Sequence, residues 1–187
     1  GVNANLPAAV AVREARQVAD DFHARRTATA RTYCYRLLNR SARPALDHNR
    51  ATWVREPLNA GAMHRAGQAL VGQHDFSAFR SAGCQARHAV RVMEAVAVVR
   101  RGEEVWVTVC ANAFLYNMVR IIVACLLQVG RGLRPESWPG ELLAAGQRSR
   151  GADTAPRDGL YLAAGHYPPD SGAPAPPPNP VGAQESE

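Results

Sequence analysis

The distribution of apolar and polar positions predicts a hairpin in the middle of the chain. Residues 90–100 and 103–110 alternate between apolar and polar side chains, as half-buried strands do, and Gly102 lies in the turn between them. Four shorter strand patterns lie at 9–15, 28–38, 53–54 and 160–167. Because a hairpin joins antiparallel neighbours, we expect a largely antiparallel sheet.

A helical pattern follows the first strands. Asn59 is placed to cap a helix over residues 60–71, and Gly72 is placed to end it. The inward stripe of this helix is predicted to contain Met63, Ala66 and Leu70. The residues that follow, 73–88, are polar and are expected to form a loop.

The segment 116–129 is apolar almost all round, which indicates a buried helix ending at Gly130. Another helix is expected over 135–145, with a proline in its first turn. Strands and helices mixed in this order favour an α+β fold. We expect a largely antiparallel mixed sheet with helices packed on one face.

The domain organisation follows from length and composition. A chain of 187 residues can build one good core or two small ones, and we expect one domain over residues 1–167. The composition then changes to Pro, Gly, Ala and Ser, which predicts a disordered tail over 168–187. The first residue is Gly1 rather than Met, so we expect the chain to be part of a longer protein.

The charge balance favours an anionic partner. The formal net charge is +6, the sequence pI is about 9.7, and the excess is rich in arginine. Arginine suits phosphate because its planar fork binds two oxygens at once. Nucleic acid is therefore one reading of the charge, and a merely basic protein without RNA affinity is the other.

The cysteines point away from metal and disulfide chemistry. They are Cys34, Cys84, Cys110 and Cys125. None forms a C-x-x-C pair and no histidine lies at ligand spacing from them, so we expect neither a metal site nor a disulfide framework. The sequence also has no signal peptide and no apolar run of membrane-spanning length, and we expect a cytoplasmic protein with no membrane partner.

Arg120 is the one charge inside the apolar helix of 116–129. A buried guanidinium is costly unless an anion meets it, so Arg120 needs a partner. Its side chain leans toward the N-terminal end of the helix, where unpaired N–H groups also favour an anion. That anion can be a catalytic carboxylate or a phosphate, or the partner can be structural, in a salt bridge to a residue such as Glu94 or Glu103.

Two clusters resemble a nucleic-acid surface, because cations interleaved with an aromatic residue can hold a phosphate backbone while a base stacks. The clusters are His23, Arg25, Arg26 and Arg31 around Tyr33, and Arg80, Arg87 and Arg91 near Gly83. Tyr33 could equally be a packed sheet aromatic, and each arginine taken alone could be a solvated surface group. The clustering, rather than any single residue, favours RNA, with Arg25, Arg31, Arg80 and Arg87 as the RNA-binding candidates.

Six segments, in order along the chain, resemble the bacterial tRNA pseudouridine synthase A family, TruA. Together DFSAFR, NAFLYNMVR and TAP-x-x-GL-x-L form a highly specific combination. The matching segments are GVNANLP at 1–7, DDFHARRTATARTYCY at 20–35, EPLNAGAMHRAGQALVGQHDFSAFR at 56–80, CQARHAVR at 84–91, NAFLYNMVRIIVACLLQVG at 112–130 and TAPRDGLYL at 154–162.

The resemblance implies an isomerase that converts uridine to pseudouridine at positions 38, 39 or 40 of the tRNA anticodon stem-loop. Such an enzyme needs no cofactor or metal and usually forms a homodimer around a basic cleft. An aspartate acts on the flipped-out uridine, the C–N glycosidic bond breaks, the base turns and a C–C bond forms. A stacking aromatic partly offsets the energy of unstacking the base.

Three residues take roles from the resemblance. Tyr33 corresponds to the family tyrosine that stacks on the target uracil. Arg120 corresponds to the arginine that pairs with the catalytic aspartate. Leu160 corresponds to the apolar residue that lines the same pocket.

The family aspartate lies in a G-R-T-D-A-G segment upstream of the GVNANLP segment, and these 187 residues contain no such segment. We therefore expect the chain to be the C-terminal portion of a synthase and to be inactive alone. The alternative is a non-catalytic RNA-binding module derived from the same fold.

Overall fold

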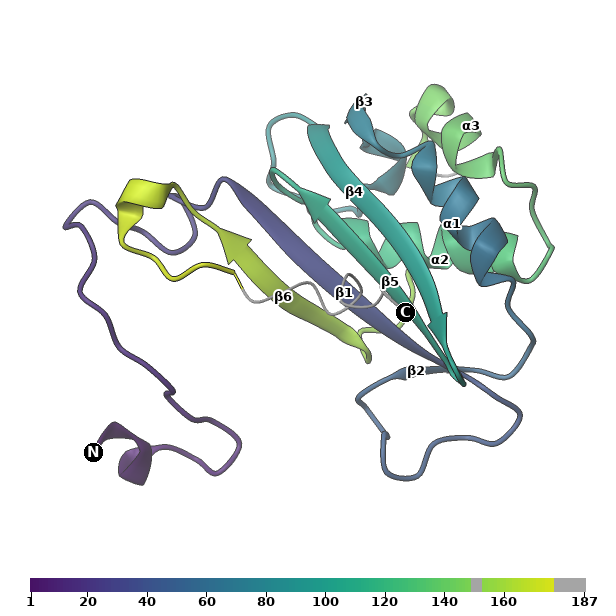
Figure 1. Cartoon of the computed structure of the whole chain (residues 1–187). Coiled ribbons are helices and arrows are strands. Elements are labelled where there is room, and N and C mark those ends of the chain that lie inside the picture. Colours follow the sequence, from purple (N-terminus) through teal and green to yellow (C-terminus); the bar gives the residue numbers. More distant parts are fainter. Residues whose placement is uncertain (149–152, 177–187) are drawn as a thin grey trace, which may run out of the picture.

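The structure is a computed structural model that describes residues 1–148 and 153–176, and within them it contains a six-stranded sheet and three α-helices (Figure 1). The strands are β1 (Ala30–Asn39), β2 (Thr52–Val54), β3 (Gly72–Asp75), β4 (Val90–Arg101), β5 (Glu104–Ala111) and β6 (Leu160–His166), and the helices are α1 (Ala60–Gln68), α2 (Met118–Gly130) and α3 (Trp138–Ala145). The α+β class is confirmed, as is the hairpin, whose turn residue Gly102 has φ +58°.

The sheet is built around β1. One edge of β1 pairs antiparallel with β5, followed by β4 and β3. The other edge is shared, because β6 pairs antiparallel with the first half of β1 and β2 pairs parallel with its last residues. Gly159 makes this sharing possible: its φ is +95°, it accepts a hydrogen bond from the Arg36 N–H, and a Cβ there would lie 2.5 Å from the Arg36 carbonyl oxygen.

The core lies between the sheet and the helices. Tyr35, Val107 and Val98 form one cross-strand row on the helix-covered face, and all three are buried. Helix α2 is buried along almost its whole length, as its apolar sequence predicts. The predicted inward residues Met63 and Ala66 of α1 are buried, as is Leu70 just after it. The Asn59 side chain caps the helix by accepting the Ala62 N–H at 2.9 Å.

Three predicted segments differ in the structure. Residues 9–15 are not a strand: the run is apolar but lies exposed in the coil that extends away from the sheet before β1 (Figure 1). Helix α1 ends at Gln68 rather than at residue 71, and Gly72 begins β3 instead of simply ending the helix. The loop expected at 73–88 therefore contains strand residues and a short 3-10 helix, Ser77–Phe79, because the edge of β4 offers backbone partners to a segment with no strand pattern.

The ends of the other helices shift slightly. Helix α2 begins at Met118 and α3 at Trp138, two and three residues later than predicted. In the predicted tail, Pro169–Ser171 form a 3-10 helix and Ser171 is buried. Residues 172–176 have no regular secondary structure, and residues 177–187 lie outside the described residues.

Candidate functional site

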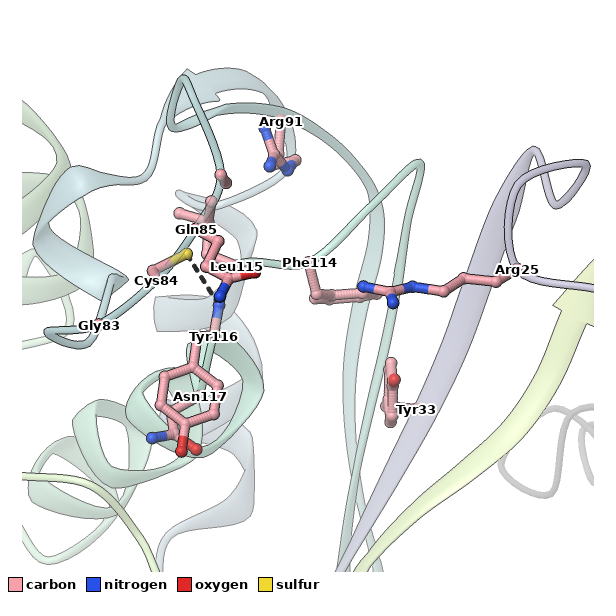
Figure 2. Close-up of a pocket in the computed structure, with 11 residues that line it drawn as sticks. Arg25, Tyr33, Gly83, Cys84, Gln85, Arg91, Phe114, Leu115, Tyr116 and Asn117 are labelled. Carbon is pink, nitrogen blue, oxygen red and sulfur yellow. Dashed lines mark hydrogen bonds between the residues drawn. The ribbon is translucent and has the colours of Figure 1, made fainter.

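A pocket of about 820 Å³ lies at the end of the helix-covered face where β1 starts and α2 begins (Figure 2). Three segments form its walls: the chain entering β1, the loop between β3 and β4, and the loop between β5 and α2. The lining residues are Arg25, Tyr33, Gly83, Cys84, Gln85, Ala86, Arg91, Phe114, Leu115, Tyr116 and Asn117. Two of them are arginines and none is acidic, so the pocket suits an anionic ligand.

Tyr33 is a packed sheet aromatic that also faces the pocket. Its ring packs edge-on against Phe114, with centroids 5.1 Å apart and an interplanar angle of 86°. The ring is only half-buried and also lines the pocket. Tyr33 is thus a sheet aromatic that Phe114 holds in place and that remains available to a flat ligand. Phe114 was not predicted as a site residue, although it is an aromatic residue within the NAFLYNMVR motif.

Arg120 has backbone and amide partners. Its Nε donates to the Ala155 carbonyl oxygen at 2.6 Å, and its Nη1 donates to Asn117 Oδ1 at 3.0 Å. In the part of the chain that the structure describes, no carboxylate lies within 4.0 Å of this guanidinium. The predicted salt-bridge partners lie elsewhere, with Glu103 on Arg40 and Glu94 against the Cys110 thiol, so the predicted salt bridge to Arg120 is not found among the described residues.

Asn117 connects Arg120 to the pocket. It precedes α2 with left-handed backbone angles, φ +59° and ψ +8°, which asparagine tolerates better than most residues. Its Oδ1 accepts from Arg120, and its Nδ2 donates to Ser81 Oγ at 3.2 Å. The side chain lean that was predicted for Arg120, toward Asn117, is confirmed. The bridging role of Asn117 was not predicted.

The hydroxyls of Tyr35 and Thr52 bind residues 156–158, next to the Ala155 carbonyl that Arg120 contacts. The Tyr35 hydroxyl lies 2.6 Å from Thr52 Oγ and donates to the Pro156 carbonyl oxygen at 2.6 Å. Thr52 Oγ in turn donates to the Asp158 carbonyl oxygen. Burial raises the pKa of the Tyr35 hydroxyl, while Thr52 and the positive charge of Arg120 act in the opposite direction.

The four predicted RNA-binding arginines fall into different environments. Arg25 is exposed and extends across the pocket toward Phe114 (Figure 2). Arg87 is exposed on the loop before β4. Arg31 donates to the carbonyl oxygens of Asn112 and Arg25, and so braces the entry to β1.

Arg80 acts as a brace for the loop that forms one pocket wall. Its Nη2 donates to the carbonyl oxygens of Cys84 and Ala86, each at 2.8 Å. The arginines predicted to cluster near Gly83 therefore have different roles. Arg80 shapes the loop, while Arg91 is buried and lines the pocket.

Leu160 lies in β6 opposite Tyr35, half-buried and packed against the core. It is not one of the residues that line the pocket of Tyr33. Leu162, two residues further along the same strand, pairs with Tyr33 and is 61% exposed. An apolar surface therefore continues from the pocket along β6.

The cysteines differ sharply in their surroundings. The backbone N–H of Tyr116 points at Cys84 Sγ at 3.4 Å and, with the N–H of Ala86, lowers the pKa of this thiol. Burial raises the pKa of Cys125 to about 12.

Among the described residues, no three His, Cys, Asp or Glu side chains converge as a metal site, and no helix is long and apolar enough to cross a membrane.

The family model and the individual relatives that match this chain are all described as tRNA pseudouridine synthases. Residues 66–168 match the family model described as tRNA pseudouridine synthase. A tRNA pseudouridine synthase A of Stenotrophomonas maltophilia is 51% identical over 168 residues, which is 90% of this chain and 66% of that protein. Proteins of the same name are 52% identical in Xanthomonas euvesicatoria, over 94% of this chain and 68% of the relative, and 49% identical in Salmonella arizonae, over 97% and 67%.

Proposed function

Because this chain belongs to the tRNA pseudouridine synthase A family, we propose that it forms the substrate pocket of an isomerase that converts uridine to pseudouridine in tRNA. The chain spans about two thirds of the length of the relatives it matches. The observation that carries the proposal is that Tyr33 and Asn117 line one pocket and that Asn117 is hydrogen-bonded to Arg120, which is not itself among the lining residues.

The roles of the residues follow from this arrangement. The exposed side of Tyr33 stacks on a uracil that has left its helix, and Phe114 prevents the ring from turning away. Arg120, with no carboxylate partner among the described residues, receives the catalytic aspartate of the family and keeps it ionised. Leu160 packs against the core beside Tyr35 and supports the pocket from β6. Arg25 and Arg87 attract the RNA backbone.

The proposal extends to finer points that the family resemblance supports. The target is uridine 38, 39 or 40 of the anticodon stem-loop, no cofactor takes part, and the full-length protein is a homodimer. Four cysteines without disulfide bonds support a cytoplasmic location. Since the 187 residues contain no G-R-T-D-A-G segment, we expect them to bind tRNA without isomerising uridine.

Two measurements test the proposal. The chain is titrated into a fluorescent RNA hairpin with the sequence of a tRNA anticodon stem-loop, and salt-dependent binding is expected. The same chain is then incubated with tRNA carrying 5-tritiated uridine, from which we expect no tritium release. Absence of RNA binding would overturn the proposed function, and clear tritium release would overturn the expected inactivity.

The coding sequence before Gly1 separates the synthase from the alternative. A G-R-T-D-A-G segment there supports an enzyme. A start codon directly before Gly1 supports an RNA-binding module without catalysis.

A further inference from the structure

Arg91 occupies an unusual position for a charged residue. It is the second residue of β4 and points to the same face of the sheet as Met93, toward the helices. Only 8% of its surface is exposed, yet it lines the pocket (Figure 2). A charge so far removed from water is unfavourable without an anion.

The hydrogen bonds of Arg91 occupy one end of its guanidinium. Nη1 donates to the carbonyl oxygens of Val90, at 2.6 Å, and His88, at 3.1 Å, and lies 3.4 Å from His88 Nδ1. In the described part of the chain, Nε is buried without a partner, and no bond from Nη2 is found. The loop thus anchors Nη1 and leaves the Nε–Nη2 edge unoccupied.

That edge lacks a protein partner, with its Nε covered by protein, and in a guanidinium it is the edge that binds two oxygens side by side. An arginine forms parallel hydrogen bonds with a carboxylate or a phosphate through such a pair of nitrogens. None of the pocket-lining residues is acidic, so the pocket itself provides no carboxylate for this edge. The exposed Arg25 on the other wall adds positive charge.

We propose that Arg91 is a buried binding site for a backbone phosphate of RNA, next to the nucleotide whose base stacks on Tyr33. This inference rests on the proposed function, because it assigns one contact within the RNA complex. The pocket favours phosphate over other anions because it also presents the aromatic rings of Tyr33 and Phe114, and a nucleotide carries both a flat base and a phosphate.

The test measures binding of the anticodon stem-loop hairpin over a series of KCl concentrations. For Arg91→Gln we expect weaker binding and a salt slope that is smaller by about one phosphate contact. Arg91→Lys keeps the charge and loses the fork, so its slope stays near that of the unchanged chain while its affinity falls. The matched control is Arg101→Gln, at the exposed far end of the same strand, which should change neither quantity.

A second measurement begins with the unchanged chain. Single backbone phosphates of the hairpin are replaced in turn by neutral methylphosphonates, and one position should weaken binding to the unchanged chain. That position should have no added effect on Arg91→Gln. If all positions are equivalent, or if Arg91→Gln matches the unchanged chain in affinity and slope, the assignment is overturned while the proposed function stands. If the unchanged chain does not bind the hairpin, both are overturned.

Discussion

Tyr35 and Arg120 hold neighbouring carbonyl groups of one segment. The Tyr35 hydroxyl binds the Pro156 carbonyl oxygen, and Arg120 Nε binds the carbonyl oxygen of Ala155, each at 2.6 Å. Tyr35 is fully buried in the sheet, whereas Arg120 lies at the start of α2. The segment before β6 therefore transmits the rigidity of the sheet to the arginine of the site.

The first prediction concerns the hydroxyl of Tyr35. Tyr35→Phe removes one oxygen and leaves Thr52 and Pro156 short of a partner, so we expect a loss of about 1–3 kcal/mol in the free energy of unfolding. Urea unfolding followed by circular dichroism measures it. Tyr161→Phe is the control, because its hydroxyl binds the Arg50 carbonyl oxygen at an exposed position and its loss should cost less than about 0.5 kcal/mol. Equal losses in both variants would contradict the argument.

The second prediction concerns the charge on α2. Arg120→Lys keeps the charge but cannot make both the Ala155 and the Asn117 bonds in the same geometry. In a protein that also carries the G-R-T-D-A-G segment, we expect kcat for tritium release to fall roughly 10²–10³-fold with KM little changed. Arg134→Lys, which alters an exposed arginine stacked on Trp138, should leave the rate unchanged. A change confined to KM would instead give Arg120 a role in binding only.

The third prediction separates the ring of Tyr33 from its hydroxyl. The proposed stacking uses only the ring, so Tyr33→Phe should bind the hairpin nearly as tightly as the unchanged chain. Tyr33→Leu should lose about 1–3 kcal/mol, or roughly 5- to 150-fold in Kd. Fluorescence anisotropy gives the affinities, and thermal unfolding checks that both variants are folded. A large loss in Tyr33→Phe would mean that the hydroxyl, not the ring face, contacts RNA.

The fourth prediction follows from the thiol in the pocket. Because the N–H groups of Tyr116 and Ala86 lower the pKa of Cys84, its thiolate forms at a lower pH than that of an ordinary cysteine. Iodoacetamide should therefore label Cys84 first, with a rate that rises at lower pH than for a free thiol, and leave Cys125 unlabelled. Peptide mass spectrometry identifies the labelled residue. Bound hairpin RNA should slow the reaction, and labelling that is indifferent to RNA would place the RNA outside this pocket.

Local sequence pattern was sufficient where each element carries its own signal. The alternation on either side of Gly102 predicts β4 and β5, and the almost wholly apolar run after Asn117 predicts α2. The sequence pattern predicted the wrong structure where pairing with a neighbouring strand determines it. Residues 72–75 have no strand signal and become β3 because the edge of β4 is available, while the apolar run at 9–15 finds no partner strand and remains coil.

The same division applies to the site. Motif residues such as Tyr33 and Arg120 could be named from the sequence, but their partners could not. Arg120 binds a backbone carbonyl 35 residues away, and any residue at position 155 would present the same atom. Arg80 and Arg91 have the same side chain and lie in one short stretch, yet one braces a loop and the other lines the pocket.

The shared edge of β1 has a consequence for how the protein is made. The strand that carries Tyr33 pairs with β6, so it is completed only when residues 160–166 are available. At a synthesis rate of about 5–20 residues per second, the ribosome needs roughly 6–25 s to travel from one strand to the other. During that interval β1 exposes an unpaired edge to other nascent chains, and the pocket lacks the segment that holds Arg120. The edge of β1 and the position of Arg120 are thus completed only after β6 has been synthesised.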